Sequence, residues 1–373
     1  MEHTFGRAGA SSGGGSSGVP ETRGLIRSHA DGWALFKIFI VNLLLTVLTL
    51  GIYRFWAKTR MRRYLWGSVE IMGDRLEYTG TGKELFLGFL FVFFLILMPL
   101  FGGISWVQDS LLGVNDGLAA ILGLVQMVVI LFLLGVALFR ARRYRLTRTH
   151  WRCIYGGQTG SAVKYGLMGL VTYFAIAPSL GLAWPACSVW LKRYEMAHTW
   201  IGNEPLEFTP SVKKLYGLFM VPWLLSVASV GIFAFTIFSL SSGLGAGASN
   251  DEMAMSIGGM AGAYLLLIPA GLSFFWYRGK AYGHFIASTR FHGHDLSSSV
   301  TGMGFMWLIV SNVLLVVFTL GLAIPITFKR VLNFVERHVG LVGDGDFNAL
   351  LQSTQEKPTR GEGLADAFDI GGI

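Results

Sequence analysis

Charged residues are scarce in this chain. Asp, Glu, Lys and Arg make up 14% of its 373 residues, whereas hydrophobic residues make up 53%. A soluble protein carries about a quarter charged residues, so this balance indicates that lipid is the main solvent. Cysteine is scarcer still. Cys153 and Cys187 are too few for a disulfide framework and are not spaced like metal ligands, so we interpret them as ordinary thiols.

Ionisable residues are also missing from the middle of every long apolar stretch. A helix needs about 20 apolar residues to cross the hydrocarbon core. Stretches of that length lack a polar face at helical period, which excludes buried helices of a soluble protein. The lack of central charges argues against a proton- or ion-coupled pump. The seven stretches are Ala34–Tyr53, Leu85–Ile104, Leu118–Phe139, Val163–Trp184, Leu215–Leu240, Gly258–Trp276 and Gly302–Ile326.

Lys and Arg are absent from two of the connecting loops. The loops Gly103–Gly117 and Ser241–Ile257 carry only acidic charges, whereas every other loop is basic. The positive-inside rule places basic loops in the cytoplasm and these two outside. The net charge of +8 is therefore explained by topology and by anionic membrane lipids as partners. We expect no nucleic-acid partner, and the sequence does not indicate a protein partner or an oligomeric state.

Seven simple crossings cannot satisfy this charge pattern. The conflict disappears if the first, fourth and seventh stretches begin and end on the cytoplasmic side. These stretches share a motif, because Thr49–Ile52 recurs as Ser179–Leu182 and as Thr319–Leu322. Glycine frees the backbone of a turn, and proline suits the first turn of the next helix. We expect kinked or re-entrant elements, with full crossings followed by interfacial helices as the alternative. Their turn residues are Gly51, Gly181, Pro185, Gly321 and Pro325.

Short alternating segments follow the basic runs. Ile71–Thr79 resembles Trp200–Thr209, and each has Gly-Asp or Gly-Asn at its centre, which predicts β-hairpins. Looser relatives of these hairpins are Thr149–Thr159, Thr289–Ser298 and His338–Phe347.

The predicted fold is an α-helical polytopic membrane protein. It has four plain transmembrane helices, three kinked or re-entrant repeat elements and short cytoplasmic β-hairpins. Residues 31–350 form a single membrane domain with internal repeats at about 78–209 and 208–347. Residues 1–30 and 351–373, which are polar or rich in Gly and Ser, are expected to be disordered tails.

Four runs of this chain resemble a known family: Asn42–Tyr53, Trp56–Arg60, Arg63–Tyr64 and Tyr78–Phe86. They are similar to the YjgN-like family of bacterial inner-membrane proteins of unknown function. The resemblance implies an integral inner-membrane protein, and it supplies no catalytic or binding residues. From the charge pattern we expect a multi-pass protein with both termini and most loops in the cytoplasm. This chain carries Phe55 where the family pattern leads us to expect proline, which predicts a less firmly fixed first turn. The resemblance covers roughly Asp31–Leu350 and rests on these four runs.

Catalytic signatures are absent. No phosphate loop, dinucleotide fingerprint, zinc-peptidase motif or Ser-His-Asp signature occurs. His292 and His294, with His284 nearby, lack an acidic or cysteine partner, so a polar loop explains them better than a metal site. Glu70, Glu77 and Glu207 alternate with apolar residues, as on solvated strand faces. We expect no cofactor, no metal and no enzymatic activity.

Polar residues at matching positions of the three repeat elements are the candidate intramembrane site. Asn42, Thr172 and Asn312 each lie nine residues before the turn glycine. They either line a central site or hydrogen-bond between packed helices, and we favour the second reading. The candidate lipid head-group contacts are Trp56, Arg60, Arg63, Arg142, Arg143 and Arg193.

Two function classes follow from this reading. The first is transport or lipid handling, built on the repeated elements. The second is a non-catalytic membrane scaffold that recruits a partner through its cytoplasmic hairpins.

Overall fold

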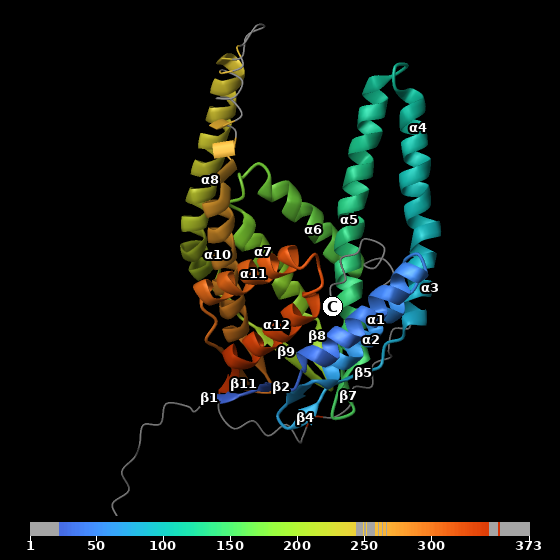
Figure 1. The fold of residues 1–373 in the computed structure, drawn as a ribbon, viewed down its shortest axis with the longest axis vertical. Coiled ribbons are helices and arrows are strands. Elements are labelled where there is room, and N and C mark those ends of the chain that lie inside the picture. Colours follow the sequence, from blue (N-terminus) through green and yellow to red (C-terminus); the bar gives the residue numbers. More distant parts are fainter. Residues whose placement is uncertain are drawn as a thin grey trace, which may run out of the picture.

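The computed structural model describes residues 22–243, 249, 251, 258–259, 261–262, 264–265, 267–342 and 350. Helices dominate it, and short strands gather at one end (Figure 1). Two pairs of long helices rise from that end, while the remaining helices form shorter pairs closer to the strands. We call the strand-bearing end the base.

Three of the helix pairs are short and turn back on themselves. In each pair, an apolar helix of 15 to 17 residues is followed by a tight turn and a helix of 14 or 15 residues. These short hairpins coincide with the three predicted repeat elements. They are α1 (Gly32–Leu48) with α2 (Arg54–Gly67), α6 (Ala162–Ile176) with α7 (Trp184–Ala197), and α11 (Gly302–Phe318) with α12 (Ile324–His338).

The Leu-Gly motif closes all three short hairpins in the same way. Gly51, Gly181 and Gly321 have φ angles of +90°, +87° and +89°, and the leucine before each is also left-handed. Each glycine N–H donates to the carbonyl oxygen five residues earlier, at 2.7 to 2.9 Å. Because glycine lacks a Cβ, it adopts this conformation without the strain that other residues incur. The three turns thus share one geometry, with Gly51, Gly181 and Gly321 as their left-handed glycines.

The expectation of a looser first turn at Phe55 is wrong. The hydroxyl of Thr49 accepts the N–H of Tyr53 at 2.9 Å, just as Ser179 and Thr319 accept the N–H four residues on in the other two turns. These hydroxyls and the left-handed pair fix the turn without help from proline. Pro185 and Pro325 lie in the first turn of α7 and α12, as predicted.

The other two helix pairs are long. The first rises through α3 (Gly82–Val92), a π-helix η1 (Phe93–Gly103) that contains Pro99, and α4 (Ile104–Leu111), and it returns through α5 (Asp116–Arg148). The second consists of α8 (Val212–Gly243) and α10 (Leu267–Ala287).

Three continuous helices in the described residues are long and apolar enough to cross a membrane: Gly82–Leu111, Asp116–Arg148 and Val212–Ser239. They correspond to three of the four predicted plain crossings. The fourth, at 258–276, lies partly outside the described residues. The three short apolar helices Gly32–Leu48, Ala162–Ile176 and Gly302–Phe318 fall in the predicted kinked elements.

The strands at the base form predicted hairpins that also pair with one another. Nine strands pair in the order β1-β12-β11-β10-β9-β8-β7-β6-β5, and three more in the order β2-β3-β4. Every pairing is antiparallel. The strands are β1 (Thr22–Gly24), β2 (Ile26–Ser28), β3 (Val69–Ile71), β4 (Asp74–Arg75), β5 (Glu77–Tyr78), β6 (Thr149–Trp151), β7 (Ile154–Gln158), β8 (Thr199–Ile201), β9 (Glu204–Phe208), β10 (Thr289–Phe291), β11 (His294–Ser298) and β12 (Val339–Val342).

The two sheets close into one ring. Single residues join them, since only Leu25 separates β1 from β2 and only Leu76 separates β4 from β5. Each helical hairpin leaves the ring on one strand and returns on a neighbour. In every hairpin, the backbone N–H of a residue just before the first helix donates a hydrogen bond to a backbone carbonyl at the end of the last helix, at 2.7 to 3.0 Å. These five bonds are His29 to Ser68, Thr79 to Arg148, Thr159 to His198, Thr209 to Ser288 and Ser299 to His338.

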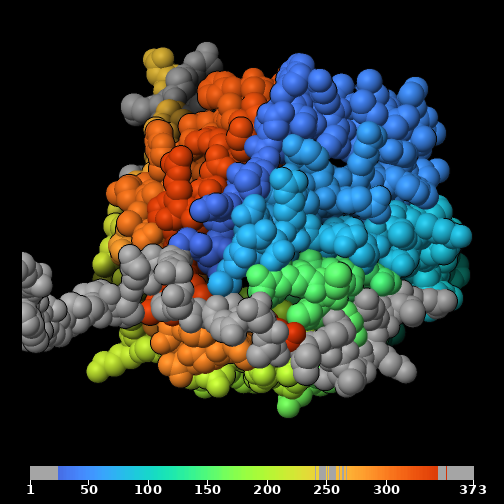
Figure 2. Space-filling model, turned by 90° about the horizontal axis from the view of Figure 1, so that it is seen from below, coloured from blue at the N-terminus to red at the C-terminus, as the bar shows by residue number. Residues whose placement is uncertain are grey.

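The five hairpins follow one another around the base in chain order. α2 contacts α3, α5 contacts α6, α7 contacts α8, α10 contacts α11, and α12 contacts α1, which closes the circle. The view from below shows the colours of the sequence running round the molecule, with the orange-red last part beside the blue first part (Figure 2).

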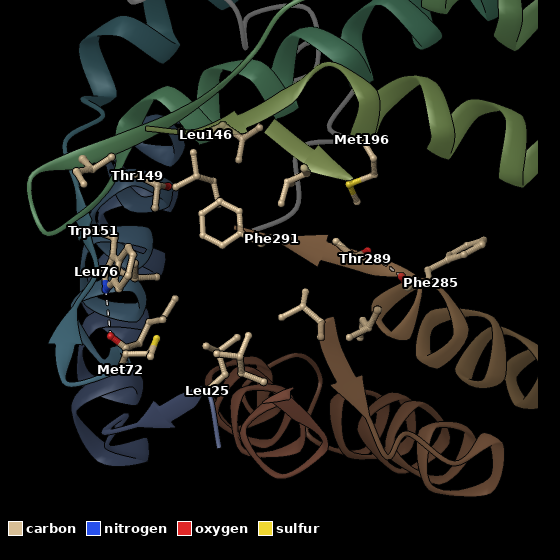
Figure 3. Close-up of a pocket in the computed structure, with 18 of the residues that line it drawn as sticks. Leu25, Met72, Leu76, Leu146, Thr149, Trp151, Met196, Phe285, Thr289 and Phe291 are labelled. Carbon is tan, nitrogen blue, oxygen red and sulfur yellow. Dashed lines mark hydrogen bonds between the residues drawn. The ribbon is translucent and has the colours of Figure 1, made fainter. Parts of the chain in front are cut away.

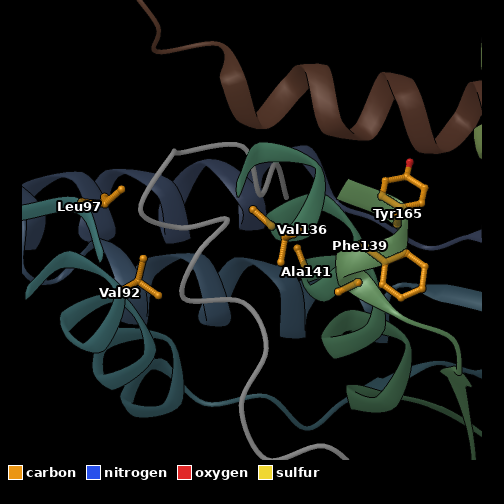
Figure 4. Close-up of a cluster of buried hydrophobic side chains, with 8 residues drawn as sticks. Val92, Leu97, Val136, Phe139, Ala141 and Tyr165 are labelled. Atoms are coloured by element: carbon orange, nitrogen blue, oxygen red, sulfur yellow. The ribbon is translucent and has the colours of Figure 1, made fainter. Parts of the chain in front are cut away.

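Long and short hairpins pack closely where α5 meets α6. A Cβ on Gly135 would lie 2.9 Å from the Cα of Gly166, so the two backbones nearly touch. Small residues allow such approach between membrane helices. Next to this contact lies a buried apolar cluster that joins α3, η1, α5 and α6 and includes Val92, Leu97 and Phe139 (Figure 4).

The N-terminal boundary of the membrane domain needs correction. Strands β1 and β2 lie within the predicted tail 1–30, and β1 pairs with β12. The tail prediction failed there because three-residue strands owe their pairing to distant partners. Residues 1–21 and 351–373 lie outside the described residues, as do the end of the hairpin predicted at His338–Phe347 and most of the acidic loop 241–257.

Candidate functional site

A cavity of about 520 Å³ lies inside the strand ring. We call it the strand chamber. The close-up shows side chains from both sheets and from the nearby helix ends pointing into one space (Figure 3). The links that close the ring, Leu25 and Leu76, both line it.

The strand chamber is lined by the same position of each repeated hairpin. The third residue of the strand that follows a returning helix faces inward in all five cases: Ile71, Trp151, Ile201, Phe291 and Leu341. The strand across each hairpin adds further inward residues. Successive side chains of a strand point to opposite faces, so this alternation gives the ring an apolar inside. The residues across the hairpins are Leu76, Gly156, Leu206 and Leu296.

The ends of three helices complete the lining. Leu146 comes from α5, Lys192 and Met196 from α7, and Tyr282 with its neighbours Phe285 and Ile286 from α10. Among the described residues that line the strand chamber, Lys192 is the one Lys, Arg, Asp or Glu.

Lys192 belongs to a charged network beside the chamber. Its Nζ donates to Glu195 Oε2 at 2.9 Å, and Arg142 of α5 donates to the same oxygen at 2.9 Å. The hydroxyl of Tyr165 in α6 donates to Glu195 Oε1 at 2.7 Å. The network therefore joins a long hairpin to a short one.

The carboxyl of Glu195 stays ionised in this network. Burial by itself raises its pKa, but the charges of Lys192 and Arg142 and the hydrogen bonds from Tyr165 and Lys192 outweigh that effect. The pKa of Glu195 therefore lies below its ordinary value of 4.5.

Leu350 packs against the strand ring. It is 5% exposed and belongs to an apolar cluster with Trp151 and Leu341, whose side chains also line the chamber. Trp151 Nε1 donates to the carbonyl of Ile71 at 3.0 Å, so the polar edge of its ring is satisfied while its apolar body stays at the cavity.

The predicted intramembrane polar residues are buried but are not joined to one another by any hydrogen bond in the described part of the chain. Asn42 donates to the carbonyl of Ala57 across its own hairpin at 3.3 Å, and Thr172 donates to Met168 in its own helix at 2.9 Å. Asn312 is 9% exposed. None of the three lines the strand chamber. A shared central site therefore stays a prediction.

The predicted lipid head-group residues divide into two groups. Four of the six are exposed, and one of these, Arg63, also donates to the carbonyl of Gly80 at 3.3 Å; the exposed residues are Trp56, Arg60, Arg63 and Arg193. Arg142 and Arg143 are half-buried, and they bind Glu195 and the carbonyl of Gly160, respectively. The second pair therefore contributes to packing at the base, and only the first group is presented outward.

The histidines and strand carboxylates occupy ordinary positions. His284 Nε2 accepts the N–H of Ser211 at 3.1 Å, and no group of three His, Cys, Asp or Glu side chains within the described ranges could hold a metal ion. Glu70, Glu77 and Glu207 lie on β3, β5 and β9, as predicted.

Sequence reasoning missed the strand chamber and Glu195. Aligning the five hairpins by their turns places Ile71, Trp151, Ile201 and Phe291 in one column, and a uniformly apolar column at one strand position is the signal of a shared interior. Closure of the ring depends on pairing between hairpins up to 320 residues apart, as for Thr22 with Val342, and no local pattern contains it.

Comparisons with known proteins identify relatives of this chain. The family model described as "Bacterial protein of unknown function (DUF898)" matches residues 26–367. The "Inner membrane protein YjgN" of Escherichia coli (strain K12) is 44% identical over 73 residues, and that of Salmonella typhimurium (strain LT2) is 39% identical over 69. These alignments cover 19% and 18% of this chain, and 18% of each relative. No solved structure matches. The chain is thus a membrane protein that belongs to the DUF898 family of bacterial proteins of unknown function.

Proposed function

We propose that this protein handles membrane lipids and that the strand chamber holds the apolar chain of an amphiphile. The chamber carries the proposal. Its volume of about 520 Å³ falls in the range of about 300–1,000 Å³ that small-molecule sites occupy. An apolar lining with one charged side chain suits a hydrocarbon chain rather than a sugar or a nucleotide.

The short hairpins support a location of the chamber beside the membrane. The turn leucines Leu50, Leu180 and Leu320 are 95%, 74% and 93% exposed. Apolar tips this exposed are costly in water and favourable in lipid. A 17-residue helix such as α1 is roughly 25 Å long, slightly less than the hydrocarbon core of about 30 Å. In our proposal these hairpins enter the bilayer from the cytoplasm and return, as repeats of one element.

The same arrangement places the chamber at the cytoplasmic side of the membrane in our proposal. With the basic loops in the cytoplasm, the strand ring lies at the cytoplasmic surface of the inner membrane, and α3–α5 and α8–α10 cross the bilayer. An amphiphile from the inner leaflet then has a short path to the chamber.

Pairing between the hairpins favours lipid handling over the scaffold hypothesis. An unpaired strand edge is a ready template for another chain. Here neighbouring hairpins pair edge to edge within each sheet, as β7 does with β8 and β9 with β10, so that only the end strands β1, β5, β2 and β4 lack a second partner strand among the described residues. The hairpins therefore have an internal role in enclosing the chamber.

A matched pair of substitutions on one strand tests the proposal. Leu206 of β9 lines the chamber, whereas the next residue, Glu207, is exposed. A long-chain alcohol bearing a diazirine is photolysed with the purified protein in phosphatidylcholine nanodiscs, and labelled peptides are found by mass spectrometry. We expect labels on chamber residues, loss of these labels in Leu206→Trp, and retention in Glu207→Trp.

Labels confined to the lipid-facing sides of the long helices would contradict the proposal. Equal chamber labelling in the two tryptophan variants would do the same, because a filled chamber cannot also hold the probe.

A further inference from the structure

We infer that the amphiphile bound in the strand chamber carries an acidic head group, and that Lys192 binds it. This inference rests on the proposed function, since it names the class of ligand that the chamber takes. Its basis is the position of one lysine side chain in an otherwise uncharged lining, together with the charges next to that lysine.

The charges beside the chamber do not cancel. Arg142 and Lys192 supply two positive charges, and Glu195 supplies one negative charge, so one positive charge remains. Arg142 and Tyr165 bind Glu195 without help from Lys192. The carboxylate therefore keeps a cation and a hydroxyl donor if Lys192 turns to another anion.

Lys192 also has donors to spare. An ammonium group donates three hydrogen bonds. Among the described residues the Nζ of Lys192 makes one, to Glu195 at 2.9 Å. Its side chain is 29% exposed and forms part of the chamber lining. Two N–H donors are available to a carboxylate or phosphate at the end of a chain.

Each of the other polar side chains of the lining has a hydrogen-bond partner among the described residues, although Tyr282 acts there as an acceptor and keeps its O–H donor. The hydroxyls of Thr149 and Thr289 donate to the carbonyls of Arg145 and Phe285, at 2.9 and 2.8 Å. Tyr282 accepts from Arg278 at 2.8 Å. Of the chamber residues, Lys192 therefore offers the strongest interaction with an anion, and it fixes which end of the amphiphile lies beside α7.

The experiment compares two probes that differ only in the head group. A long-chain fatty acid and the alcohol of equal length, both bearing a diazirine, are photolysed separately with the full-length protein in phosphatidylcholine nanodiscs at pH 8. Labelling of chamber peptides is divided by labelling of α8, which corrects for the amount of each probe in the bilayer. Lys192→Met is the test variant, and Lys213→Met, at an exposed position on α8, is its control.

We expect the fatty acid to label the chamber at least about tenfold more than the alcohol, as a charge-assisted hydrogen bond allows. Lys192→Met should bring this ratio close to one and leave alcohol labelling unchanged, while Lys213→Met should keep the preference. An unchanged ratio in Lys192→Met, or equal labelling by both probes in the unmodified protein, would overturn the inference but leave the proposed function standing. Absence of chamber labelling by either probe would instead overturn both.

Discussion

The short and long hairpins differ in the length of their helices but are joined to the strands of the base in the same way. The short α6–α7 hairpin turns at Gly181 after a helix of 15 residues, whereas α5 alone runs for 33 residues. Both kinds are closed at the ring by the same backbone hydrogen bond, from the N–H at the end of the first strand to a carbonyl at the end of the last helix. In the short α6–α7 hairpin it joins Thr159 to His198, and in the long hairpin that ends with α5 it joins Thr79 to Arg148.

This difference separates two determinants of the fold. The strand ring sets the position of each hairpin, and all five hairpins are joined to it by the same backbone hydrogen bond. The sequence between the ends sets the length of the hairpin. A Leu-Gly turn ends its first helix after 15 to 17 residues, whereas a longer apolar run gives a helix long enough to cross a membrane. The hairpins can therefore be perturbed one kind at a time.

The largest expected effect is at Glu195, which joins long α5 to short α6 and α7. Glu195→Gln leaves Arg142 and Lys192 without a counter-charge, and we expect a loss of about 3 kcal/mol of unfolding free energy. Thermal unfolding in detergent, followed by circular dichroism, measures it. Glu207→Gln on exposed β9 is the control and should change stability by less than about 0.5 kcal/mol.

The pH dependence checks the same group. Because the folded pKa of Glu195 is lowered, its contribution is complete above the unfolded pKa of 4.5 and is lost as the pH falls through the folded value. The unfolding temperature of the unmodified protein should fall below pH 4.5 more steeply than that of Glu195→Gln. Parallel curves for the two proteins would contradict the assignment.

The second effect concerns the contact between α5 and α6. A side chain at Gly166 would lie 2.8 Å from Val136 Cγ2, whereas one at Gly169, a turn away on the same helix, meets nothing within 4 Å. We expect Gly166→Leu to be about 2–3 kcal/mol less stable than Gly169→Leu, because overpacking separates the helices. Similar unfolding temperatures would mean that the two hairpins do not depend on this close approach.

The third effect contrasts glycines of the two hairpin kinds. Gly181→Ala places a Cβ at a φ of +87°, which costs about 1–2 kcal/mol. Gly231, inside the long helix α8, has open space around its Cβ position, so Gly231→Ala should gain up to about 1 kcal/mol of helix propensity. The two alanine variants should thus shift the unfolding temperature in opposite directions, and shifts of one sign would refute this contrast.

The smallest effect distinguishes the short hairpins from one another. In two of them a tyrosine hydroxyl accepts the N–H of the residue before the first helix, Tyr64 for Asp31 and Tyr194 for Ser161. The third has Phe334 at the matching position. Phe334→Tyr should stabilise the protein by about 1 kcal/mol, and Tyr194→Phe should destabilise it by a similar amount. Calorimetric unfolding of both variants measures the two changes. If Phe334→Tyr does not raise the unfolding temperature, the added hydroxyl does not accept the N–H before α11 as Tyr64 and Tyr194 do in the other two hairpins.

Sequence alone predicted the parts of this fold that depend on local chemistry. Turns at Gly51, Gly181 and Gly321 and a hairpin at Ile71–Thr79 follow from glycine conformation and from alternation, and the structure has left-handed glycines and antiparallel strands there. The ring could not be predicted, because each strand is two to five residues long and its partners lie on other hairpins. The candidate site was missed for the same reason, since the chamber exists only once the ring has closed.

In our proposal the short hairpins return to the side of the membrane from which they start, and the residues flanking α6–α7 provide the decisive test. Cys153 lies in the turn before this hairpin, and Asn203 lies in the turn after it; both are exposed. Intact and permeabilised cells are treated with a membrane-impermeant maleimide, with one cysteine present at a time: Cys153 in a Cys187→Ser background, or Asn203→Cys in a background that carries both Cys153→Ser and Cys187→Ser. The account predicts labelling at both positions only after permeabilisation, and labelling of one of them in intact cells would contradict it.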